Sequence, residues 1–172
     1  DGAPPMIENL CIARRLVEAG ARFVSLNFSR WDWHGSDGMN FPKCREECPR
    51  LDQGLAALVT DLHERGLDRD VSVVVWGEFG RTPKINSNNS RDHWPQAQSI
   101  LLAGGGFQHG QVIGATNDKA EYPVSKPVSV EDFCAIVYHA MGLRVDDTIM
   151  DLSGRPTHLV PSGTVPVELL KA

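Results

Sequence analysis

Residues 71–83 have the sequence Val-Ser-Val-Val-Val-Trp-Gly-Glu-Phe-Gly-Arg-Thr-Pro, and this stretch decides the predicted fold. Its first six residues form a nearly continuous apolar run, which is typical of a strand buried on both faces. The run stops at Gly77, and Glu78 and Arg81 follow directly. Charged side chains at the end of a buried strand predict a ligand site at the edge of an open sheet.

Helical and extended patterns alternate along the rest of the chain. Apolar residues at helical spacing predict helices over residues 4–20, 51–66 and 129–141, the last opened by a capping-box pattern at Ser129 and Asp132. Runs rich in β-branched and aromatic residues predict strands over 22–28, 71–76, 99–103 and, shorter, 111–115. Because a helix between two strands is the βαβ unit of a parallel sheet, we predict an α/β fold and one domain over residues 1–172.

Composition limits the classes of partner. The 172 residues are 41% hydrophobic and 23% charged, as in an ordinary globular protein with a sizeable core. A net charge of -5 gives no reason to expect a nucleic-acid or membrane-surface partner. No apolar run approaches the length of a membrane span.

The four cysteines divide into two kinds. Cys11 and Cys134 have apolar neighbours and are predicted to be buried free thiols. Cys44 and Cys48 are four residues apart, a spacing that is compatible with a local disulfide, a metal pair or neither. A zinc finger needs a second pair, which is absent, so we expect no metal role and leave the disulfide open.

Carboxylates and histidines gather where the predicted strands end. Asp32 and His34 are two residues apart just after the 22–28 strand, so in extended chain their side chains point to the same side. Glu78 follows a buried strand, where an acid is costly without a partner. The polar loop 84–92 ends in Asp92 and His93.

Each of these residues also has a purely structural interpretation. Glu78 and Arg81 are suited to a buried ion pair that fixes the turn, and His93 to a local hydrogen bond. Their joint placement at strand ends nevertheless favours a metal-centred site acting on an anionic substrate. The predicted metal ligands are Asp32, His34, Glu78, Asp92 and His93, and the predicted anion-binding catalytic residues are Arg81 and Arg91.

A series of short motifs also runs through nearly the whole chain. They are Trp31-Asp32-x-His34-Gly35, Leu51-Asp52-Gln53, Asp61-Leu62-x-x-Arg65-Gly66-Leu67, the Gly77–Pro83 string, Arg91-Asp92-His93-Trp94-Pro95, Gly104-Gly105-Gly106, Gly114-Ala115-Thr116 and Gly154-Arg155-Pro156. In this order they resemble the DUF1501 proteins, bacterial proteins of unassigned activity that are abundant in planctomycetes. That family is similar to the alkaline phosphatase and sulfatase superfamily.

The resemblance implies a three-layer α/β/α fold with a mostly parallel sheet, of which this chain is expected to be the C-terminal portion. It also implies hydrolysis of a phosphate or sulfate ester, small or polymeric, with divalent zinc or manganese. Asp32, His34 and His93 resemble superfamily ligands. Glu78 stands where the superfamily often has an Asp-His pair, but Phe79 replaces the His, and Asp92-His93 is the alternative for that pair. The nucleophile is expected in an N-terminal part.

A second hypothesis is a non-catalytic module that binds a sulfated or phosphorylated polymer or a partner protein. A third is that the chain completes its sheet by forming a homo-oligomer through an exposed edge. Members of the resembling family often carry export signals, which implies an extracytoplasmic location, periplasmic or secreted. Such a compartment permits a Cys44–Cys48 disulfide.

Overall fold

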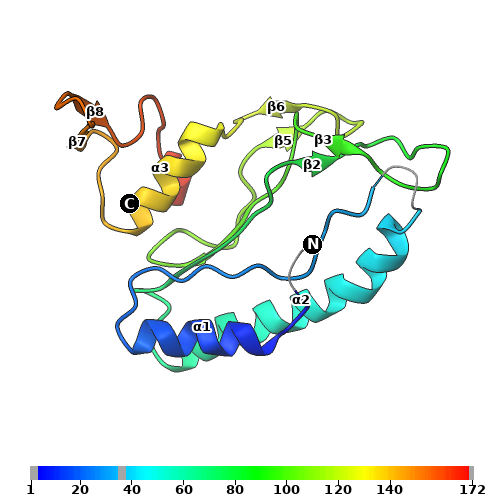
Figure 1. The fold of residues 1–172 in the computed structure, drawn as a ribbon, viewed down its shortest axis with the longest axis horizontal. Coiled ribbons are helices and arrows are strands. Elements are labelled where there is room, and N and C mark those ends of the chain that lie inside the picture. Colours follow the sequence, from blue (N-terminus) through cyan, green and yellow to red (C-terminus); the bar gives the residue numbers. More distant parts are fainter. Residues whose placement is uncertain (1–3, 35–37, 171–172) are drawn as a thin grey trace.

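The computed structural model describes residues 4–34 and 38–170, so Gly35 of the first motif lies outside the described residues. These residues form three α-helices, eight short strands and one 3-10 turn (Figure 1). The helices are α1 (Glu8–Glu18), α2 (Asn40–Glu64) and α3 (Val130–Ala140), and the turn η1 spans Val167–Leu169. The strands are β1 (Ser72–Val75), β2 (Gly80–Arg81), β3 (His93–Trp94), β4 (Leu101–Gly104), β5 (Ala115–Thr116), β6 (Pro123–Ser125), β7 (Thr148–Met150) and β8 (Pro156–His158).

The predicted three-layer α/β/α fold with a mostly parallel sheet is wrong. The strands pair as four separate two-stranded sheets, β1-β4, β2-β3, β5-β6 and β7-β8, and every pair is antiparallel. The parallel sheet required residues 22–28 to be a strand beside β1. That segment is extended but belongs to no sheet among the described residues, and it crosses the molecule above α1 and α2 (Figure 1).

The decisive stretch instead enters a long antiparallel ribbon. Ser72 pairs with Gly104 and Val75 with Leu101, and further out Gly80 pairs with Trp94 and Arg81 with His93. The two sheets β1-β4 and β2-β3 are therefore successive parts of one folded-back segment whose tip is the polar loop 84–90. Because this connection contains no helix, the strands run antiparallel.

Three consecutive glycines close the base of this ribbon. Gly104 and Gly105 have φ of 73° and 65°, in the left-handed region that glycine adopts without steric cost. A Cβ at Gly104 would lie 2.2 Å from the Val71 carbonyl oxygen, and one at Gly105 would lie 1.7 Å from Ser72 Oγ. The glycines are thus required for the end of β4 to pack against the start of β1.

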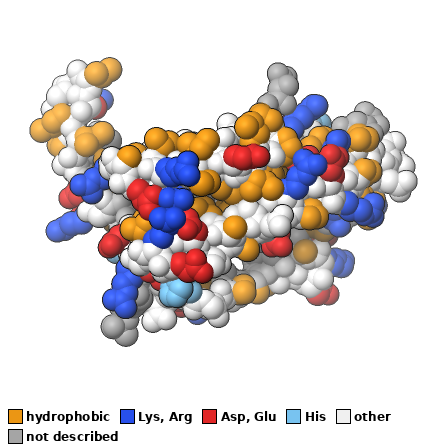
Figure 2. All heavy atoms as spheres, turned by 90° about the horizontal axis from the view of Figure 1, so that it is seen from below, with side chains coloured by type: hydrophobic (Ala, Val, Ile, Leu, Met, Phe, Trp, Pro, Cys, Tyr) orange, Lys and Arg blue, Asp and Glu red, His pale blue; other side chains and the backbone are white. Residues whose placement is uncertain are grey.

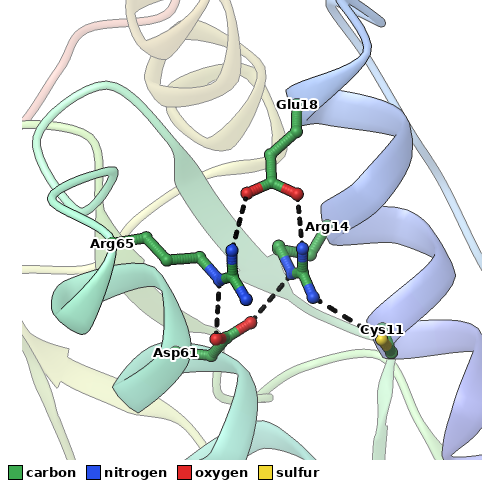
Figure 3. Close-up of polar contacts among 5 residues, drawn as sticks. All are labelled: Cys11, Arg14, Glu18, Asp61 and Arg65. Carbon is green, nitrogen blue, oxygen red and sulfur yellow. Dashed lines mark hydrogen bonds and ion pairs between the residues drawn. The ribbon is translucent and has the colours of Figure 1, made fainter.

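Helices α1 and α2 pack side by side and are joined by ion pairs. Arg14 Nε on α1 lies 2.8 Å from Asp61 Oδ2 on α2, and Arg65 Nη1 reaches back to Glu18 Oε1 at 3.2 Å (Figure 3). Arg14 also pairs with Glu18, and Arg65 Nε lies 2.7 Å from Asp61 Oδ1. On the face that these helices form, basic and acidic side chains alternate instead of forming a patch of one sign (Figure 2).

The start of α2 differs from the sequence prediction. The helix begins at Asn40 rather than Leu51 and continues through Pro49. Proline in a helix interior removes one backbone hydrogen bond and usually ends or kinks a helix, so the sequence pattern favoured a start after Pro49. The earlier start matters for the site, because it brings the first turns of α2 against residues 31–34.

Helix α3 has the predicted start and packs on the C-terminal segment. Ser129 and Asp132 form the capping box, and the Asp132 carboxylate also accepts from Thr164 N at 2.8 Å. Ile136, one turn further along the helix, forms a small core with Phe107 and Leu169. The capping prediction is confirmed.

The cysteine predictions have mixed outcomes. Cys11 and Cys134 are exposed, so the expectation that they are buried is wrong. Cys44 and Cys48 are free thiols, and the disulfide left open from the sequence is not formed. Among the described residues, none of the helices has the length and apolar character needed to cross a membrane.

Candidate metal centre

An unusual backbone conformation positions the first motif. Ser29 and Trp31 both have positive φ, 60° and 58°, a region that non-glycine residues rarely occupy. The Trp31 indole N–H donates to the Phe28 carbonyl, and Trp33 is buried. Such backbone outliers are held in place by surrounding contacts and cluster at functional sites. Here they direct Asp32 and His34 toward the ribbon.

The β2-β3 hairpin supplies the other half of the site. Arg81 and His93 are direct cross-strand partners. Side chains of directly opposed residues in an antiparallel pair lie on the same face, about 5 Å apart at Cβ. Both therefore reach the end of the extended segment that precedes α2, which passes beside this hairpin (Figure 1).

Two imidazole nitrogens converge on one carboxylate oxygen, which makes a group of three potential ligands. His93 Nε2 lies 3.0 Å and His34 Nε2 3.2 Å from Asp32 Oδ1. Ligand atoms of the three residues all lie within 4.8 Å of one another. The two imidazole rings meet edge to face at 4.3 Å, and the Phe79 ring packs on the His93 ring at 4.5 Å. Aromatic packing on both rings restricts their orientations.

Three nitrogen-bearing side chains surround the Asp32 carboxylate. A hydrogen bond from His93 lowers its pKa, and the charges of His34, His93 and Arg81 act in the same direction while desolvation opposes them. Asp32 therefore stays ionised well below neutral pH. Its side chain is 57% exposed, so an ion and a small substrate have access from solvent.

Arg81 is anchored beside the three ligands. Its Nη2 donates to the Trp31 carbonyl at 2.7 Å and lies 3.8 Å from Asp32 Oδ1. Its Nη1 is buried and has no hydrogen-bond partner among the described residues. A buried guanidinium N–H without an acceptor is costly, and an anionic oxygen is the acceptor that an arginine fork suits best.

The donor set fits a divalent metal ion. Two imidazole nitrogens and one carboxylate match the three protein ligands of catalytic zinc sites, which keep further positions open for water or substrate. The three side chains come from two segments, 32–34 and 93, that are 59 or more residues apart in the sequence. Their convergence is therefore a property of the tertiary fold.

The other predicted site residues lie elsewhere. Glu78 is exposed between β1 and β2, outside the three-ligand group, and not buried as its position after an apolar run suggested. The Asp92 carboxylate accepts from Asn86 Nδ2 at 3.1 and 3.2 Å within the ribbon loop. Arg91 donates to the carbonyls of Thr82 and Pro83, and its guanidinium lies over the Phe41 ring. Asp92 and Arg91 thus hold the loop.

Sequence reasoning missed two contributors. The Trp31 carbonyl fixes Arg81, and the Phe79 ring supports His93. Because every residue type has a backbone carbonyl, the sequence gives no signal for the Trp31 carbonyl as an acceptor. The only sequence signal for Phe79 is that it occupies the position where the family resemblance implies a histidine.

Comparison with known families agrees with the motifs. The family model "Protein of unknown function (DUF1501)" matches residues 3–170. The chain belongs to this family. Comparisons with curated proteins and with solved structures found no match.

Proposed function

We propose that the chain holds a divalent metal ion, zinc or manganese, through Asp32, His34 and His93, and that it is part of a metal-dependent hydrolase-like domain acting on phosphate or sulfate esters. The observation that carries the proposal is the convergence of three ligand atoms within 4.8 Å, beside the guanidinium of Arg81. An ion next to a fixed arginine is the combination that binds and neutralises a tetrahedral oxyanion.

Each residue then has a separate task. Asp32 supplies the negative charge and the two histidines supply neutral nitrogen ligands. Arg81 Nη1 is the donor that lacks an acceptor, and it would contact an ester oxygen while Nη2 stays on the Trp31 carbonyl. A bound ion would add Lewis-acid polarisation of the ester.

The Thr82 hydroxyl, which follows Arg81 in the chain, is not available as the attacking group. Thr82 Oγ1 donates to the Lys84 carbonyl at 2.9 Å and accepts from Asp92 N at 3.1 Å. A hydroxyl engaged in both directions is poorly placed to act as a nucleophile. Water, or a group outside the site described here, would have to attack.

The engagement of the Thr82 hydroxyl in two hydrogen bonds favours the alternative function, a non-catalytic module that binds an anionic ester group. It has a place for an ion and an arginine for an oxyanion, and within residues 4–34 and 38–170 the Thr82 hydroxyl is already engaged in two hydrogen bonds. The face formed by α1 and α2 mixes both signs of charge, so this face does not favour a polyanion (Figure 2).

Metal binding is tested first. We would titrate the metal-free chain with Zn²⁺ and with Mn²⁺ by calorimetry, and repeat the titration with Asp32→Asn, His93→Ala and the control His158→Ala. His158 lies on β8, outside the three-ligand group. We expect one ion per chain, lost in the first two variants and retained in the control. Retention of binding in Asp32→Asn and His93→Ala, with circular dichroism unchanged, would refute the site.

Anion recognition is tested separately. Vanadate binding and hydrolysis of p-nitrophenyl phosphate and p-nitrophenyl sulfate would be measured on the metal-loaded chain and on Arg81→Gln. We expect Arg81→Gln to keep the ion and lose vanadate binding. Hydrolysis that depends on Arg81 supports the hydrolase, whereas binding without turnover supports the binding module.

A further inference from the structure

Two thiols lie one turn apart near the start of α2. Cys44 is half-buried and Cys48 is exposed, and both are free. They line one shallow hollow on the helix surface together with Phe41, Arg45, Pro49 and Asp52. Residues four apart on a helix are neighbours on the same face, about 5–6 Å apart at Cβ.

This separation decides between a disulfide and a bridging ion. A disulfide requires the two Cβ atoms to approach to roughly 3.5–4.5 Å, which a regular helical turn does not allow. A metal ion between two sulfurs adds two bonds of about 2.3 Å each in place of one S–S bond. The thiols of Cys44 and Cys48 can therefore bridge through an ion while α2 stays helical.

The number of available ligands selects the kind of ion. Among the described residues no His, Cys, Asp or Glu joins the two thiols to make a third ligand, although Asp52 lines the same hollow. Zinc in structural sites takes four ligands, so two thiols alone do not satisfy it. Soft thiolates favour Cu(I), which is stable with two ligands in line.

We propose that Cys44 and Cys48 form a two-thiolate site for a soft monovalent cation, with Cu(I) as the physiological type. On binding, each thiol loses its proton and each sulfur forms one bond to copper, so two protons are released and no electron is transferred. The bound unit carries one net negative charge. The absence of a second cysteine pair, which excludes a zinc finger, does not weigh against an ion that needs only two ligands.

The surroundings suit a dithiolate that holds a cation. Arg45 and Asp52 line the hollow with opposite charges, and the charge of Arg81 also acts on Cys44, so two cationic groups face one carboxylate around the negative unit. Burial raises the pKa of the Cys44 thiol, and the neighbouring Cys48 thiol adds to that rise. The thiolate is both the nucleophile and the metal ligand, so Cu(I) must displace the proton that burial favours.

The test is an anaerobic Cu(I) titration of the full chain against a chromophoric Cu(I) chelator. We expect one Cu(I) per chain, withdrawn from the chelator, and release of about two protons per ion. Cys44→Ser and Cys48→Ser should each abolish this binding. Cys11→Ser and Cys134→Ser, which remove the other two free thiols, should leave it unchanged.

Three results would overturn the inference. One is that the wild-type chain withdraws no Cu(I) from the chelator. Another is that Cys11→Ser or Cys134→Ser loses binding as completely as Cys44→Ser. The third is a copper-dependent dimer in size-exclusion chromatography, which would place the ion between chains. His93→Ala should retain Cu(I) and lose Zn²⁺, so failure of the thiol site and failure of the Asp32–His34–His93 site are distinguishable.

Discussion

Substitution of Gly80 by Ala tests how the hairpin sets up the site. A Cβ at this position would lie 2.0 Å from the Ala97 carbonyl oxygen and 3.4 Å from the Trp94 carbonyl oxygen. Carbon and oxygen atoms need at least 3.0 Å, so the backbone must move by about 1 Å. Overpacking of this kind costs about 1–3 kcal/mol. Because the atom in the way belongs to the backbone, no rotamer change relieves it.

The movement would be transmitted directly to the site. Gly80 precedes Arg81, and its cross-strand partner Trp94 follows His93. We expect Gly80→Ala to lower the free energy of unfolding in urea by about 1–3 kcal/mol. The zinc affinity of the Asp32–His34–His93 site should also fall roughly tenfold or more, as it does when groups that orient metal ligands are disturbed.

Gly77→Ala is the matched control for this substitution. The closest atom to a Cβ at Gly77 is the Phe79 carbonyl oxygen at 3.8 Å, an ordinary contact. Replacing an unstrained glycine by alanine stabilises by about 0.4–1 kcal/mol through the unfolded chain. Equal urea midpoints and equal zinc affinities for Gly80→Ala and Gly77→Ala would refute the reasoning.

Two further substitutions test other parts of the structure. The Asp132 pKa is lowered from 3.8 to about 2, chiefly by hydrogen bonds from Ser129 and Thr164, so its stabilisation is complete above pH 4 and is lost as the pH falls toward 2. With solvent screening, Asp132→Asn should lower the free energy of unfolding in urea by about 1–2 kcal/mol at pH 7. This loss should shrink as the pH falls toward 2. The control Glu131→Gln, in the same helical turn, should show a smaller loss at pH 7 and a smaller change with pH. Arg14→Gln should lower the thermal midpoint and speed hydrogen exchange in α1 more than Arg15→Gln, because of these two arginines only Arg14 pairs with α2. Added salt should reduce the difference in thermal midpoint between the two variants. Equal behaviour of the two variants would contradict a role of Arg14 in joining α1 to α2.

The helices could be predicted from the sequence because their signals are local. Apolar spacing of three and four residues marks α1, the second half of α2 and α3, and Ser129 with Asp132 forms the expected cap. The strand pairing could not be predicted in this way. An apolar run such as Val71–Trp76 predicts an extended chain, but the identity of its partner depends on the path of the connection. Here the connection folds back through a polar loop instead of crossing over through a helix.

The candidate site could likewise be predicted from the sequence only in part. Residue type and spacing singled out Asp32, His34 and His93, and the structure brings those three together. The expected cause, strands ending at one edge of a parallel sheet, does not exist in this fold. Glu78 and Asp92 were chosen by that same argument, and without the shared edge they lie outside the group.

The first turns of α2 connect the site to the rest of the fold. Asn40 Nδ2 donates to the Trp33 carbonyl at 2.8 Å in a buried position, directly between Asp32 and His34 in the chain. The next residue, Phe41, packs under Arg91, whose guanidinium holds the carbonyls that follow Arg81. One end of a single helix thus braces both segments that supply ligands. Since an ion bound only by the folded arrangement stabilises that arrangement, metal binding should protect the start of α2 as well as the hairpin.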